Sequence, residues 1–186
     1  MDNNFDLRNQ LDREFEEESD RGCAVLTVCL LEEALARLFS KVLAGGERAA
    51  KHFMPKGRLS VGVANAHALG LLNDLAVDNF KLILEIRNIF AHKLLTNVSF
   101  RSEAIKSKIK ALQLPNMDEV PEHKKQIIRS PRKHFMMVID SLFFTLEWLS
   151  DHAKPLAVTN MPQWKLRKAP SHLLRAHQRR TTDPEA

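Results

Sequence analysis

The segment Arg87-Asn88-Ile89-Phe90-Ala91-His92 combines residue types that are common in sites of proton transfer and anion binding. Histidine titrates near neutral pH, and arginine presents a planar fork of N–H donors. In a helix, however, Arg87 and His92 lie about 140° apart around the axis and about 7.5 Å apart along it. One straight helix does not aim both side chains at one small target. A site here therefore requires that the helix ends near His92 or that a second chain completes it.

The same residues also have a structural interpretation. Arg87 pairs with a buried acid in that interpretation, and Glu33 is the candidate partner, while Asn88 and His92 satisfy backbone groups at a helix C-terminus. A third possibility is a binding role without catalysis. The sequence leaves these three interpretations open.

Basic residues outnumber acidic ones in the region that follows the motif, which predicts contacts with a polyanion. The candidate residues are Arg101, Lys106, Lys110, Lys124 and Lys125. Lys106 and Lys110 share the helix face opposite the apolar one, as residues of an ordinary solvated face also do. The aromatic residues Phe53, Trp148 and Trp164 are not interleaved with these basic groups, so stacking on single-stranded nucleic acid is not indicated.

Neither a metal nor another cofactor is expected. Cys23 and Cys29 lie in one predicted helix with about 9 Å of rise between them, so they do not bridge each other, and packing thiols are the simpler interpretation. The eight histidines show no ligand spacing.

The elements that position these residues are all predicted to be helices. The apolar run from Cys23 to Phe39 occupies every direction of a helical wheel, which predicts a central buried helix. Ser130-Pro131 predicts an N-cap followed by proline at the first helical position. The other expected helices cover residues 5–18, 47–53, 60–70, 77–91 and 101–112, and the one that starts at Pro131 runs to about Leu149. The fold class is therefore an all-α, single-domain bundle of about six to eight helices.

Length and composition set the domain organisation. The chain has 186 residues, of which 44% are hydrophobic, enough for one ordinary core. Residues 1–153 are expected to form the helical domain, and residues 154–186 a basic tail that is extended or ordered by a partner. No apolar run reaches the roughly 18 residues that cross a bilayer, and residues 1–20, with net charge −6, are too acidic for a targeting peptide. A cytoplasmic location is expected.

Four segments in order resemble the mannitol operon repressor family over about residues 15–153. They are Asp20-Arg21-Gly22-Cys23-Ala24 leading into Leu31-Glu32-Glu33-Ala34-Leu35, then Ala68-Leu69-Gly70-Leu71-Leu72, then Ile86 to His92, and finally Pro131-Arg132-Lys133-His134-Phe135. The resemblance implies an all-helical, dimeric bacterial regulator of transcription in sugar-alcohol or related metabolism. It supplies no element that reads DNA.

The best helix-turn-helix candidate, residues 49–68, fails on two positions. Phe53 falls where a small residue is needed, and Pro55 would break the first helix. Regulation through a protein partner, without a helix-turn-helix of its own, is therefore the leading expectation.

The Arg-Asn-x-x-x-His string also resembles the motif of HEPN-type domains, many of which are metal-independent RNA endonucleases. That resemblance covers six residues. It implies that His92 assists proton transfer at the ribose 2′-hydroxyl or the leaving oxygen, that Arg87 holds the scissile phosphate and that Asn88 supports the geometry. Two chains would bring their pairs together. A ribonuclease is the alternative to a regulator that is not an enzyme.

Overall fold

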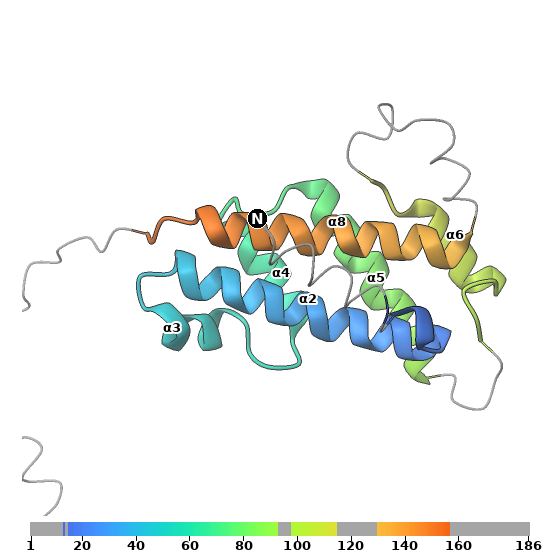
Figure 1. The fold of residues 1–186 in the computed structure, drawn as a ribbon. Coiled ribbons are helices and arrows are strands. Elements are labelled where there is room, and N and C mark those ends of the chain that lie inside the picture. The colour runs from blue at the N-terminus through green and yellow to red at the C-terminus, as the bar shows by residue number, and fades with distance from the viewer. Residues whose placement is uncertain (1–12, 14, 93–97, 115–129, 157–186) are drawn as a thin grey trace, which may run out of the picture. The chain divides into compact units, whose positions relative to one another are not determined.

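The structure, a computed structural model, describes residues 13, 15–92, 98–114 and 130–156. Over these residues it is all-helical, without a strand. The helices are α2 (Asp20–Val42), α3 (Gly46–Phe53), α4 (Leu59–Ala68), α5 (Asp74–His92), α6 (Glu103–Ala111) and α8 (Pro131–His152). Figure 1 shows α2 and α8 running side by side along the bundle. The all-α prediction is confirmed.

The apolar run that begins at Cys23 forms the central helix, as predicted. α2 starts after Ser19, whose hydroxyl accepts a hydrogen bond from the Gly22 N–H at 3.0 Å. It packs against α3, α4, α5 and α8, and ten of its side chains are buried. The helical-wheel pattern of residues 23–39 predicted that this helix is buried on every side, and the structure differs from that prediction. Val25 and Leu26 remain 39% and 38% exposed, and Cys29 is exposed as well.

Most helix boundaries follow the local signals. α3 ends at Phe53, two residues before Pro55, and α8 begins at Pro131 after Ser130. The prediction for α4 was wrong at its start, because the helix begins at Leu59 and not after Ser60. α5 begins at Asp74, earlier than predicted, because the Asn73 side-chain oxygen accepts a hydrogen bond from the Ala76 N–H at 2.9 Å.

The predicted core faces of α6 and α8 are the buried ones. α6 is shorter than the predicted span of residues 101–112, but its apolar positions face inward. The buried residues of these two regions are Ile105, Ile109, Leu112, Phe135, Val138, Ile139, Leu142, Phe143 and Leu146. Phe100, in the turn before α6, joins them, with its ring centroid 5.0 Å from that of Phe135.

Parts of the predicted organisation lie outside the described residues. Residues 15–17 are helical and Phe15 is buried, but most of the predicted surface helix over residues 5–18 is not described. Nearly all of the predicted tail, residues 157–186, also lies outside the described residues. None of the described helices is long and apolar enough to cross a membrane.

Candidate functional site

The Arg87 to His92 segment forms the last turns of α5. Ile86 and Phe90 are fully buried, Arg87 is half-buried, and Asn88 and His92 are exposed, with His92 as the last helical residue. The helix therefore buries the apolar face of the segment and leaves its polar residues at the edge and on the outside. α5 does end at His92, but His92 is itself still helical, so the helix end does not turn it toward Arg87. A catalytic role for the two residues therefore stays a prediction that requires a second chain.

The structure places Glu33 beside Arg37 and not beside Arg87. Arg37 Nη2 lies 3.4 Å from Glu33 Oε1, and Arg37 Nη1 lies 2.8 and 2.7 Å from the two carboxylate oxygens of Glu147 on α8. The Glu33 side chain is 76% exposed, so it is not a buried acid that needs a partner. Arg87 makes no ion pair with any residue that the structure describes.

This arrangement predicts losses of folding stability of different size for two arginine substitutions. Arg37→Ala is expected to cost about 1 to 2 kcal/mol of folding stability, because it leaves the Glu147 carboxylate, 13% exposed, without its partner. Arg87→Ala is expected to cost less than about 1 kcal/mol, since it strands no acid. Urea unfolding followed by circular dichroism measures both. A larger loss for Arg87→Ala would mean that Arg87 holds a buried group after all.

The predicted polyanion contacts are partly neutralised. Arg101 and Lys106 line a small cavity of about 320 Å³ together with Ser130 and Pro131 at the start of α8. Lys106 also pairs with Glu103 at 3.2 Å. Lys110 is exposed on α6, and Lys124 and Lys125 lie outside the described residues. Binding of a polyanion here stays a prediction.

A larger hollow lies beside the exposed face of α2, and we name it the α2–α3 groove. It has a volume of about 800 Å³ and is lined by Cys29, Glu32, Glu33, Ala36, Lys51, Met54, Pro55, Lys56 and Gly57. Cys29, Ala36, Met54 and Pro55 give it an apolar floor. Val25 lies four residues before Cys29 on the same face of α2, so the apolar surface continues past the groove. This groove was not predicted from the sequence.

Several contacts hold the wall of the groove in place. Glu32 Oε1 accepts a hydrogen bond from the backbone N–H of Gly57 at 2.6 Å, and Gly57 has a φ of +76°, which favours glycine. Asn65 Nδ2 donates to the Phe53 carbonyl at 2.5 Å. Gly62 on α4 leaves room for Met54, since a Cβ there would lie 2.5 Å from the Met54 Cγ. The groove is therefore formed by the fold without a ligand.

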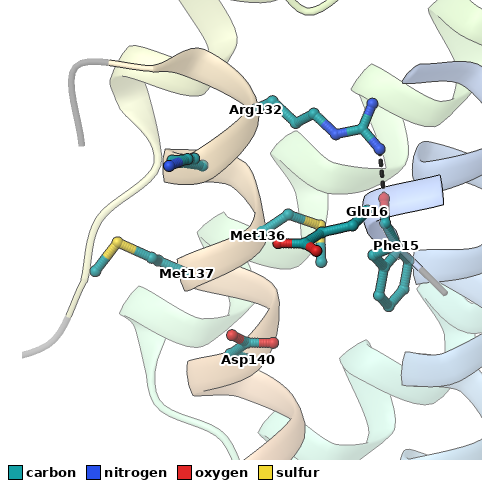
Figure 2. A pocket seen from close by; sticks show the side chains of 7 residues that line it. Phe15, Glu16, Arg132, Met136, Met137 and Asp140 are labelled. Atoms are coloured by element: carbon teal, nitrogen blue, oxygen red, sulfur yellow. Dashed lines mark hydrogen bonds between the residues drawn. The ribbon is translucent and has the colours of Figure 1, made fainter. Parts of the chain in front are cut away.

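A second cavity, of about 270 Å³, lies where the N-terminal residues meet α8 (Figure 2). Its lining residues are Phe15, Glu16, Arg132, Lys133, Met136, Met137 and Asp140. Arg132 donates to the carbonyls of Phe15 and Glu18 and pairs with Asp20 at 2.8 Å. The other Asp20 oxygen accepts from the Phe100 N–H at 2.9 Å. Arg132 thus anchors the chain entering α2 to the start of α8, and we interpret this cavity as structural.

The two cysteines have different environments. Cys23 is fully buried, with its Sγ 3.3 Å from the Met136 Sδ, and burial raises the pKa of its thiol to about 12. Cys29 is exposed on the floor of the α2–α3 groove. Among the described residues, no group of three His, Cys, Asp or Glu side chains is placed to hold a metal ion.

Comparisons with known proteins give one distant similarity. No family model matches the sequence, and the comparison with curated proteins finds no match. Among solved structures, the chain is similar to the X-ray structure of the MtlR-HPr complex from Escherichia coli. The match covers 77% of this chain and 95% of the matched chain, at 20% sequence identity and a TM-score of 0.47. At these values no conclusion about activity or partners follows from the match.

Proposed function

We propose that this protein is a transcription-related regulator of the mannitol operon repressor type that acts through protein contacts. It has no enzymatic activity of its own in this proposal, and it works in the cytoplasm as a homodimer. The four ordered segments that resemble that family support the class of function. The α2–α3 groove is the observation that supports the mode of action.

The groove suits a protein partner because of where its apolar surface lies. α2 is the central helix, yet it leaves Val25 and Leu26 exposed near the groove, and Cys29 of the apolar floor is exposed as well. Contiguous exposed apolar surface of this kind is characteristic of interaction sites, because it loses contact with water only when a partner covers it. A helical regulator without a DNA-reading element needs such a surface.

A capture experiment tests this proposal. Tagged full-length protein would be incubated with lysate of its native cells, and the retained proteins quantified by mass spectrometry. Ala36→Glu places a charge on the apolar floor and is expected to reduce retention of a specific partner by about tenfold or more, the equivalent of 1.4 kcal/mol. Ala64→Glu, at an exposed position on α4, is the matched control and should retain the partner. Equal retention by both variants, or no retained protein at all, would contradict the proposal.

A further inference from the structure

The charges around the α2–α3 groove are not equally satisfied. Glu32 accepts a hydrogen bond from the Gly57 N–H, and Glu33 pairs with Arg37 at 3.4 Å, so both acids are held on the α2 side of the groove. Lys51 and Lys56 line the other side and are exposed, and neither forms an ion pair with a described residue. The groove therefore has an apolar floor, two acids on its α2 side and, along the opposite rim, two lysines that no described acid pairs.

We propose that the occupant of this groove is an amphipathic helix of a partner protein that turns an apolar stripe to the floor and carboxylates to Lys51 and Lys56. This inference rests on the proposed function and names the chemistry of its partner. The carboxylates lie on one flank of the partner helix, next to its apolar stripe.

The shape of the floor favours a helix. Cys29 and Ala36 are seven residues apart on α2, so they span about 10 Å of the floor, and Val25 extends the same face to about 16 Å. Apolar side chains at positions i, i+3 or i+4 and i+7 of a partner helix match that length. A helix also satisfies its own backbone hydrogen bonds. An extended peptide would place unpaired N–H and C=O groups against an apolar floor, because the backbone groups of α2 and α3 are already bonded within their helices.

The charge pattern favours acidic flanks. Each pair of a partner carboxylate with Lys51 or Lys56 is solvent-exposed and contributes modestly, but two such pairs discriminate against a basic helix by repulsion as well as attraction. A nucleic acid would satisfy the lysines but would leave the apolar floor without a complementary surface. The floor and the rim together therefore select an acidic amphipathic helix.

Two matched peptides test the inference on the full-length protein. Each is a fluorescein-labelled helix of about 18 residues, roughly 27 Å long, with a leucine stripe. One carries glutamates beside the stripe, and the other carries lysines at the same positions. Fluorescence anisotropy is expected to show that the acidic peptide binds about tenfold more tightly, a difference of 1.4 kcal/mol. The difference should shrink at roughly 0.5 M salt, where the Debye length is about 4 Å.

Reversing the charge of the two lysines tests whether they set the preference for the acidic peptide. The double variant Lys51→Glu, Lys56→Glu is expected to prefer the basic peptide, whereas the control double variant Lys41→Glu, Lys81→Glu, at exposed positions on α2 and α5, should keep the original preference. The reactivity of the exposed Cys29 thiol shows whether the peptide binds in the groove. The bound acidic peptide should slow the reaction of Cys29 with a thiol reagent about tenfold, a change that Cys23 cannot mimic because it is buried and its thiol stays protonated.

The outcomes separate this inference from the proposed function. Binding of neither peptide, equal binding of both peptides or an unchanged preference in the Lys51→Glu, Lys56→Glu variant overturns the acidic-helix inference. If that variant still retains the native partner while Ala36→Glu loses it, the groove remains the contact surface and only the partner chemistry is wrong. If Ala36→Glu retains the partner fully, the proposed function itself fails.

Discussion

Replacing Phe100 with alanine is expected to lower the free energy of unfolding by about 3 to 5 kcal/mol. Its side chain is 1% exposed, and its ring centroid lies 5.3 Å from that of Phe90 on α5 and 5.0 Å from that of Phe135 on α8. The truncation therefore opens a cavity where three segments meet. It also removes two aromatic contacts, each worth about 0.5 to 1.5 kcal/mol beyond burial. Urea unfolding followed by circular dichroism measures the loss.

Two control variants sharpen that result. Phe100→Leu keeps most of the buried volume and is expected to cost roughly 1.5 kcal/mol or less. Ser99→Ala, at the neighbouring half-buried position, should change stability by less than about 1 kcal/mol. A cost below 1 kcal/mol for Phe100→Ala would mean that the cluster repacks around the missing ring and that Phe100 is not its centre.

This cluster shows what periodicity can and cannot predict. Phe90 and Phe135 lie on regular apolar faces of predicted helices, and their burial followed from a spacing of three or four residues. Phe100 lies in a turn between two helices, where no repeat signals its direction. Its ring packs against Phe90 and Phe135, and its backbone N–H donates a hydrogen bond to Asp20, eighty residues earlier. Such long-range contacts are not encoded in any local pattern.

The incorrect partner for Arg87 has a related physical cause. Charge type alone makes Glu33 a candidate partner for Arg87, but Arg37, four residues after Glu33 on the same helix, is favourably placed to pair with it. The structure adds Glu147, which lies on α8 and holds Arg37 with both oxygens. Charge type narrows the possible partners of an ion pair, but the packing of two helices decides which acid lies within reach.

The exposed α2 face beside the α2–α3 groove belongs to a helix whose apolar pattern is visible in the sequence, although complete burial was the wrong interpretation of that pattern. Apolar residues around the whole circumference of the Cys23 to Phe39 segment predicted complete burial within one chain. The structure buries most of that circumference and leaves the Val25 and Cys29 side exposed. When a helix has an apolar face that no other helix of the same chain covers, that face indicates a contact with a partner. The wall of the groove was not predictable, because Glu32 and Gly57 meet across twenty-five residues.

Two of the family-like segments prove to be structural neighbours. Asp20 and Cys23 from the first segment contact Arg132 and Met136 at the start of α8, at 2.8 Å and 3.3 Å. Arg132 belongs to the last segment, and Phe135 of that segment is fully buried. These residues therefore hold the fold together, and the resemblance to the family rests in part on residues that pack the bundle.

Arg132→Ala is expected to cost about 2 to 4 kcal/mol of folding stability. The substitution removes the partner of Asp20, whose side chain is 25% exposed, and leaves the carbonyls of Phe15 and Glu18 without their donor. Cys23 lies in the same corner of the molecule, one turn after Asp20 in α2 and beside Met136 of α8, so burial of its thiol is expected to depend on this corner. Loosening this corner should make Cys23 accessible to a thiol reagent in the folded protein, at least tenfold faster than in the wild type, which corresponds to 1.4 kcal/mol of local opening.

Thiol labelling distinguishes this anchor from an ordinary surface arginine. Lys133→Ala removes the neighbouring exposed charge and should leave both stability and Cys23 labelling within experimental error of the wild type. Asp20→Asn keeps the size of the side chain and weakens only the charged contact. If the anchor acts as one unit, Asp20→Asn and Arg132→Ala together should cost less than the sum of their separate effects. Additive costs, with Cys23 still protected in Arg132→Ala, would show that burial of the N-terminal corner does not depend on Arg132.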